Sequence, residues 1–261
     1  MRTVDKLKSH PQIGIPLLSQ SFNMDMPTFS SIVSSSNTDK NGNMKLFSAV
    51  QWMQDCSVIA FMEDSAFCAW LNEQGATPVV NFRQLQVFRV PGLRERLTCS
   101  TYVYDLQGAF GYRNTAIYDA QGKPCYMSWS IAAFVNLATG RLSRISREVQ
   151  NTLQFPPRLD MTYGSRKITL PDTQWSTLEP FRVLRDDIDY NNHMNNAQYI
   201  RMALECLPED FQVSGLRVEY RKPVMPGSII SPTIAYGANT ACVVLSVGEN
   251  TCCVVEFSAH E

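Results

Sequence analysis

The sequence has little net charge and no long apolar run, and both absences narrow what the chain can do. Its 23 Lys and Arg residues nearly balance 24 Asp and Glu residues, so the net charge is −1 and general nucleic-acid binding is not expected. No stretch approaches the roughly 18 consecutive apolar residues of a membrane span, and the first residues lack the apolar core of a signal peptide. We therefore expect a globular cytoplasmic protein without a membrane span.

The sequence also lacks the signatures of several common catalytic and metal sites. Its eight cysteines form no CxxC pair and no zinc-ligand spacing, and there is no GxSxG motif of a serine hydrolase. We interpret the cysteines as reduced, mostly buried thiols, and we expect neither a metal nor another cofactor. Histidine is scarce as well. His10 and His260 lie near the termini, which leaves His193 as the one imidazole within the body of the chain.

The stretch DIDYNNHMNN combines this histidine with carboxylate and amide side chains. Asp189, Asn191 and His193 alternate, so an extended or turn-like segment points all three side chains the same way. Asn195 or Asn196 can cap the helix predicted to follow, and free amides at a helix start attract a partially negative oxygen. Polar residues before a helix are also ordinary capping, but the histidine favours a hydrolytic site.

A similar pattern occurs earlier in the chain, in NTDKNGNMKLFSAVQWMQDC. Asn43 stands there in place of His193, and an amide cannot accept a proton near neutral pH. We interpret the pattern as an internal duplication whose first copy is chemically silent. A single gapless alignment pairs four identical residues: Asp39 with Asp189, Asn41 with Asn191, Met44 with Met194, and Cys56 with Cys206.

Hydrophobic periodicity predicts the same order of elements in both halves. Each half has a short strand, a long helix and four antiparallel strands. The first long helix, over residues 47–75, is apolar on most sides and must be buried, and the concave face of the sheet can cover it. An arm over residues 1–27 precedes these elements. The strands are expected at 28–35, 79–89, 96–106, 108–119 and 125–136, and then at 213–221, 228–236, 240–247 and 251–259.

The fold class is therefore α+β, with two tandem domains. We expect an N-terminal domain over residues 1–145, a linker over 146–175 and a C-terminal domain over 176–261. The segment over residues 141–167, which overlaps this linker, has six cations against two acids in a chain of net charge −1. Such a charge run is either a solvated loop or a docking patch for an acidic partner. The six residues are Arg141, Arg144, Arg147, Arg158, Arg166 and Lys167.

The duplicated helix-in-sheet pattern and the motif D-x-D-x-N-x-H-x-N-N resemble the acyl-acyl carrier protein (ACP) thioesterases, which are tandem, or double, hot-dog proteins of plastids and bacteria. The first half also resembles the family through GNMKLFSAVQWMQD. The resemblance implies hydrolysis of the thioester that joins a fatty acyl chain to acyl carrier protein. It implies acyl-chain binding in the first half and catalysis in the second, by Asp189, Asn191 and His193.

The resemblance also implies a tunnel for the acyl chain along the first long helix. We expect Met53, Ile59 and Trp70 to line this tunnel, and Asn196 to bind the substrate at the start of the second helix. His193 would accept a proton from the attacking water, and Asp189 would orient the imidazole of His193. Alternatively, Asp189 could itself act as the base or nucleophile.

The sequence departs from the family's plant members at one position. These members carry an acid followed by Cys where this chain has Pro223 and Val224. Glu205 and Glu219 are the nearest acids in the sequence, and neither matches the motif position. The acidic role is therefore either missing or supplied from elsewhere in the fold.

Several other functions remain open from the sequence. The enzyme could act on acyl-coenzyme A, or the chain could be a non-catalytic acyl-binding hot-dog protein or, less favoured, a dehydratase. The intact Asp189, Asn191 and His193 set favours catalysis. Acyl chain length cannot be derived from these residues, and the sequence leaves open whether the chain forms a homodimer.

Overall fold

The computed structural model describes residues 27–63, 65–147, 150, 153 and 155–259. The N-terminal arm predicted over residues 1–27 lies, apart from Pro27, outside these described residues. None of the described helices is long and apolar enough to cross a membrane.

The two halves of the chain repeat one order of elements. Strand β1 (Thr28–Ile32), helices α1 (Leu46–Glu63) and α2 (Ser65–Glu73), and strands β2 (Ala76–Val87), β3 (Arg96–Gln107), β4 (Phe110–Asp119) and β5 (Pro124–Asn136) form the first half. Strands β6 (Ser176–Thr177) and β7 (Phe181–Arg182), helix α4 (Asn196–Leu204), and strands β8 (Val213–Tyr220), β9 (Ile229–Tyr236), β10 (Thr240–Val247) and β11 (Asn250–Ala259) form the second. The nine predicted strands end within three residues of these bounds.

The strands of both halves join in one antiparallel sheet. Its order is β1-β3-β4-β5-β2-β8-β11-β10-β9-β6, with β7 on β9. At its centre β2 pairs with β8, where Arg83 lies opposite Val218 and Leu85 lies opposite Leu216. The junction between the halves is therefore continuous sheet.

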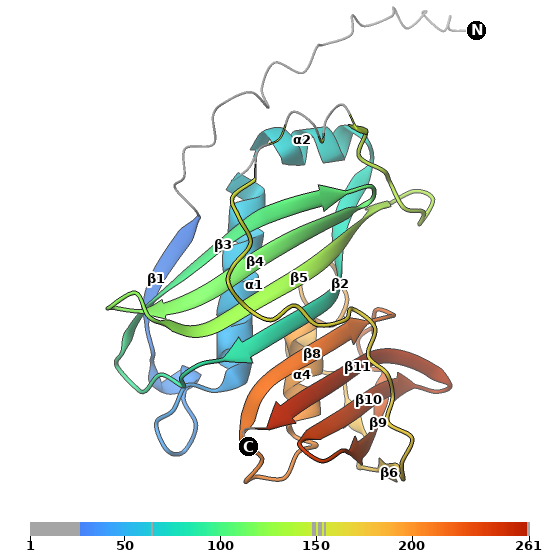
Figure 1. Cartoon of the computed structure of the whole chain (residues 1–261). Coiled ribbons are helices and arrows are strands. Elements are labelled where there is room, and N and C mark those ends of the chain that lie inside the picture. The colour runs from blue at the N-terminus through green and yellow to red at the C-terminus, as the bar shows by residue number, and fades with distance from the viewer. Residues whose placement is uncertain (1–26, 64, 148–149, 151–152, 154, 260–261) are drawn as a thin grey trace, which may run out of the picture.

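Helices α1 and α4 pack against each other on one face of this sheet (Figure 1). Met53 of α1 and Ile200 of α4 belong to one buried apolar cluster, which also contains Leu85 of β2 and Leu216 of β8. The face that carries the two helices is therefore the shared core of both halves, and we call it the helix face.

The two helices run antiparallel. Lys40, before α1, forms an ion pair with Glu209, after α4. Gln54, in the middle of α1, donates to Asn195 at the start of α4. The end of α4 thus lies near the beginning of α1, and the beginning of α4 lies near the middle of α1.

The duplication predicted from the sequence is confirmed in the backbone. Asp39 N donates to Asn43 O at 2.8 Å, and Asp189 N donates to His193 O at 3.0 Å. A 3-10 turn precedes each of these loops, at Ser35–Asn37 and Arg185–Asp187. Helices α1 and α4 then begin at Leu46 and Asn196, which are separated by the same number of positions as Asp39 and Asp189.

The single long helix predicted over residues 47–75 is wrong, because the chain forms α1 and α2 instead. Ile59 and Met62 of α1 are 49% and 59% exposed, so this helix is not buried on all sides. Trp70 and Leu71 of α2 pack with Phe134 in a second, smaller cluster. A straight helix with apolar residues all round cannot turn them all toward one sheet, and two helices can cover more of it.

Part of the predicted linker is packed against the sheet. Residues 155–175 form neither helix nor strand, and they cross the face opposite the helices (Figure 1). Gln84 Nε2 donates to Thr162 O and Gly164 N donates to Gln84 Oε1, both at 2.8 Å. The ring of Tyr163 lies 5.4 Å from that of Trp129. This segment is therefore an ordered strap on what we call the outer face.

Candidate functional site

The catalytic residues predicted from the sequence lie in one tight loop, residues 189–193, which we call the site loop. Asp189 Oδ1 accepts a hydrogen bond from Asn191 N at 2.9 Å. Asn192 has a φ of +61°, in the left-handed region that asparagine tolerates better than most residues. Gly42 occupies the same place in the first copy, with a φ of +79°. Asn191 itself is exposed, and no hydrogen bond of its side chain is described.

Asp189 and His193 face each other across the site loop. His193 Nδ1 lies 3.9 Å from Asp189 Oδ1, which is within ion-pair range but too long for a hydrogen bond. The His193 side chain is 35% exposed and that of Asp189 is 12% exposed. The imidazole can therefore meet water and lies within ion-pair range of a mostly covered carboxylate.

The same turn is used differently in the two copies. Asp39 Oδ1 accepts two backbone hydrogen bonds, from Asn41 N and Asn43 N, each at 2.9 Å. Asp189 Oδ1 accepts one such bond within the described part of the chain, and its remaining capacity faces His193. The carboxylate is a structural group in the first copy and is available to an imidazole in the second.

The start of α4, next to the site loop, offers a hydrogen-bond donor to a partially negative substrate oxygen. Asn195 is the N-cap residue, and its Oδ1 accepts from Ala197 N at 2.8 Å. Gln54 Nε2 donates to the same oxygen at 3.0 Å. No partner is described for the N–H of Asn196, the first residue of α4, and this amide lies at the positive end of the helix dipole. Gln54 was not predicted from the sequence as a site residue. The indication available there was a polar side chain within a largely apolar helix.

The C-terminal half of α1 extends past the start of α4. Because the helices are antiparallel and Gln54 meets the N-cap of α4, residues 55–63 continue beyond it, by about 13 Å at 1.5 Å per residue. They therefore lie on the N-terminal side of α4, the side on which the site loop precedes the helix. Ile59, which we expected inside the acyl tunnel, lies exposed on this segment together with Met62.

The position where the family's plant members carry an acid lies directly beside the site loop. Val224 N donates to the Tyr199 hydroxyl at 3.0 Å, and Val224 O accepts from Met194 N at 2.8 Å. These two bonds fix the segment that contains Pro223 against the residue after His193. The site therefore lacks a carboxylate at this place.

The two nearest acids in the sequence do not replace it. Glu205 follows α4 at its C-terminal end, far from the site loop. Glu219 is held on the outer face, where it pairs with Arg221 at 2.9 Å and accepts from Ile168 N. Neither carboxylate lies on the helix face beside His193.

The remaining predicted residues are not gathered at one place. Met53 is fully buried in the main core, whereas Trp70 belongs to the cluster around α2. The six predicted docking cations are all exposed, and none pairs with a carboxylate of the described residues. They fall into two groups, one beside α2 and one on the strap: Arg141, Arg144 and Arg147, and Arg158, Arg166 and Lys167.

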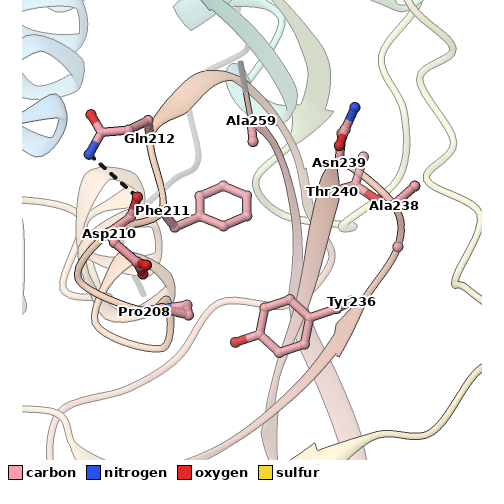
Figure 2. A pocket seen from close by; sticks show the side chains of 10 residues that line it. Pro208, Asp210, Phe211, Gln212, Tyr236, Ala238, Asn239, Thr240 and Ala259 are labelled. Atoms are coloured by element: carbon pink, nitrogen blue, oxygen red, sulfur yellow. Dashed lines mark hydrogen bonds between the residues drawn. The ribbon is translucent and has the colours of Figure 1, made fainter. Parts of the chain in front are cut away.

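A surface pocket of about 390 Å³ lies away from this site, at the other end of α4 (Figure 2). Phe211 and Tyr236 form part of its wall, and Asp210 is its one carboxylate. Its lining contains neither histidine nor cysteine, so it lacks an imidazole base and a thiol for hydrolysis. Within the described residues, no three His, Cys, Asp or Glu side chains gather as metal ligands would.

Comparisons with known proteins agree with this arrangement of two halves. A family model described as the acyl-ACP thioesterase N-terminal domain matches residues 28–153, and one described as the C-terminal domain matches residues 171–253. An acyl-ACP thioesterase structure from Bacteroides thetaiotaomicron superposes with a TM-score of 0.79 at 19% identity, over 89% of this chain and 97% of that one. The 12:0-ACP thioesterase of Umbellularia californica gives a TM-score of 0.78 at 16% identity, over 89% and 96%. The predicted double hot-dog fold is confirmed.

Similar curated sequences are plant chloroplast enzymes. A palmitoyl-acyl carrier protein thioesterase of Gossypium hirsutum is 29% identical over 68% of this chain and 48% of its own length. An acyl-[acyl-carrier-protein] hydrolase of Cuphea viscosissima is 27% identical over 60% of this chain and 40% of its own length. The chain thus spans about half the length of these relatives or less. Since the two family models together match most of its residues, the chain belongs to the acyl-ACP thioesterase family.

Proposed function

We propose that this chain hydrolyses the thioester of a fatty acyl group carried by acyl carrier protein, releasing the free fatty acid and so ending its synthesis. The observation that carries the proposal is the pairing of Asp189 with His193 at the start of α4, at the place where the first copy has only Asn43. Both family models and the curated relatives support this reaction.

The geometry supports a direct attack by water. The thioester carbonyl oxygen lies at the start of α4, where the Asn196 N–H and the helix dipole stabilise developing negative charge. His193 accepts a proton from water as the oxygen adds to the carbonyl carbon, and Asp189 stabilises the imidazolium. The carbon–sulfur bond then breaks, and the imidazolium returns the proton to the thiolate. The exposed Asn191 positions the water or the carbonyl.

The two halves divide the work in this proposal. The first domain, residues 1–145, binds the acyl chain, and the second, residues 176–261, carries the reacting groups. The exposed Ile59 lies along α1 where an acyl chain would approach the site loop, and Met53 and Trp70 line deeper parts of the first half. The eight free thiols of the chain fit a reducing compartment, so we place the reaction in the cytoplasm.

The test compares two variants at equivalent positions. His193→Ala should lower kcat by about 10²–10⁴-fold, the usual contribution of a general base, on both acyl-ACP and acyl-coenzyme A. Asn43→Ala changes the same turn in the silent copy and should leave kcat within about twofold of wild type. A folded His193→Ala enzyme with near-normal turnover would exclude His193 as the base, and wild-type protein that hydrolyses no thioester would refute the proposal.

We propose that the carrier docks on the cations beside α2. Arg158, Arg166 and Lys167 lie on the strap, on the face opposite His193, whereas the other group follows β5 next to α2 and α1. Rim charges mainly set the encounter rate, and salt screens them over roughly 8–10 Å. Replacing Arg141, Arg144 and Arg147 with Ala should raise KM for acyl-ACP at low salt more than the same change in the strap group.

A short uncharged thioester serves as the control substrate, and neither triple variant should alter its hydrolysis. If a triple variant loses activity equally on acyl-ACP and on the short thioester, its residues have a structural role and do not dock the carrier. If only the triple variant of the strap group raises KM for acyl-ACP, the carrier docks on the outer face. An acyl-coenzyme A thioesterase, the alternative function, would show no preference for the carrier and a weak dependence on salt.

A further inference from the structure

Arg83 is a buried cation at the centre of the sheet. It lies in β2, the strand that joins the two halves, and it is 4% exposed. Among the described residues, its Nη1 has no hydrogen-bond partner and no carboxylate lies within ion-pair distance of its guanidinium. Burial lowers the pKa of this guanidinium, yet arginine keeps its charge in proteins.

The strand register places Arg83 on the helix face. It lies opposite Val218 of β8, which is buried in the shared core beneath the helices. Directly opposite residues of an antiparallel pair share a face, as do residues two apart in one strand. Tyr220 is therefore on the same face, and its hydroxyl donates to Asn196 O at 3.2 Å. This places Arg83 in the floor beneath the start of α4.

The floor around Arg83 is polar where it enters the first half. Arg83 is opposite Ser130 of β5, and Ser130 is opposite Arg113 of β4. Arg113 Nη1 donates to Thr101 Oγ1 at 3.2 Å, and Ser57 of α1 lies 3.4 Å from the same hydroxyl oxygen. The surface that α1 covers thus carries guanidinium and hydroxyl groups in a row, beside the apolar residues of the core.

A tunnel that binds only hydrocarbon has no use for such a group. A guanidinium has five donors and no acceptor, and burying a charge without a partner is costly, whereas Leu or Met would fill a similar volume without that cost. An unsubstituted acyl chain contains no acceptor beyond the thioester. The missing acceptor therefore points to the ligand, because an acyl chain that crosses from the start of α4 over β8 to β2 would reach Arg83.

We propose that Arg83 is a specificity-determining residue that donates a hydrogen bond to an oxygen substituent on the acyl chain of the substrate. The substituent is a hydroxyl, keto or carboxylate oxygen placed a few bonds beyond the thioester or at the far end of the chain. The preferred substrates are then oxygenated acyl thioesters. This inference rests on the proposed thioester hydrolysis and adds the class of acyl group.

The test measures kcat/KM on acyl-ACP substrates of one chain length. The acyl groups are unsubstituted, 3-hydroxy, 3-oxo and terminally carboxylated, and the proteins are wild type, Arg83→Met and Arg217→Met. Arg217 is the matched control, because it lies opposite Gln84 on the neighbouring strand but points to the outer face, where it pairs with Glu256. Wild type and Arg217→Met should prefer at least one oxygenated substrate by tenfold or more. Arg83→Met should lose that preference while keeping its activity on the unsubstituted chain.

A second readout does not depend on turnover or on the variant's folding. Binding of the matching free acids to wild-type protein, measured by calorimetry, should show the same preference for oxygenated chains. If wild type hydrolyses and binds the unsubstituted chain as well as every oxygenated one, or if Arg83→Met loses equally on all substrates, the inference is wrong. If wild type hydrolyses nothing but binds oxygenated acids through Arg83, the inference stands and the proposed hydrolysis fails.

Discussion

The substitution Tyr199→Phe tests how the segment around Pro223 is held at the candidate site. The Tyr199 side chain is buried, and its hydroxyl accepts from Val224 N at 3.0 Å and lies 3.3 Å from Lys222 O, to which it can donate. Phenylalanine keeps the ring and removes only this oxygen. The buried N–H of Val224 would then have no partner, which costs about 1–3 kcal/mol.

This cost should appear both in stability and in turnover. The midpoint of thermal unfolding should fall by about 2–4 °C for each kcal/mol lost, as is typical for chains of 150–250 residues. Val224 O also accepts from Met194 N, the residue after His193, so a shift of this segment moves the imidazole and should lower kcat more than it raises KM.

Chemical denaturation and steady-state kinetics on the same preparations provide the measurement. Tyr236→Phe is the matched control, because Tyr236 is 46% exposed and loses its hydroxyl on the surface, with an expected change within about 0.5 kcal/mol. If Tyr199→Phe unfolds at the same denaturant concentration as wild type, the hydroxyl does not hold Val224. If stability falls and kcat does not, the segment does not position His193.

Four further variants probe the loop, the duplication and the acyl path. Asn192→Gly should leave kcat unchanged and stabilise the chain by up to about 1 kcal/mol, because glycine accepts the positive φ without strain; a large loss of activity would give Asn192 a chemical role. The double variant Asn43→His, His193→Ala should remain inactive, and measurable hydrolysis would show that either copy can host the reaction. Ile59→Ala should alter chain-length preference with little loss of stability, whereas Met53→Ala should lower the free energy of unfolding by about 2–5 kcal/mol. Product analysis and denaturation measure the two effects separately, and an unchanged product profile for Ile59→Ala would place the acyl path away from this part of α1.

The sequence by itself determined the elements of this fold and their repetition. Alternating apolar residues defined nine strands to within three residues, because the side-chain period of a strand is a local property. The gapless match between the two halves identified the duplication and singled out His193 against Asn43, since matched positions in a repeat adopt the same local backbone. Those two patterns were enough to place a candidate site before α4.

Tertiary structure decided what these local patterns leave open, because it depends on contacts between residues far apart in the chain. The contact of Gln54 with Asn195, the hydrogen bond from Val224 N to the Tyr199 hydroxyl, and the position of Glu219 on the outer face all follow from how strands and helices pack. The break between α1 and α2 arises because one straight helix cannot cover the whole sheet. Arg83 illustrates the difference between what local sequence spacing determines and what tertiary packing determines. Its period-two spacing with Leu85 puts the two side chains on the same face of the strand, but only the packed sheet showed that this is the helix face and that no carboxylate of the described residues meets Arg83 there.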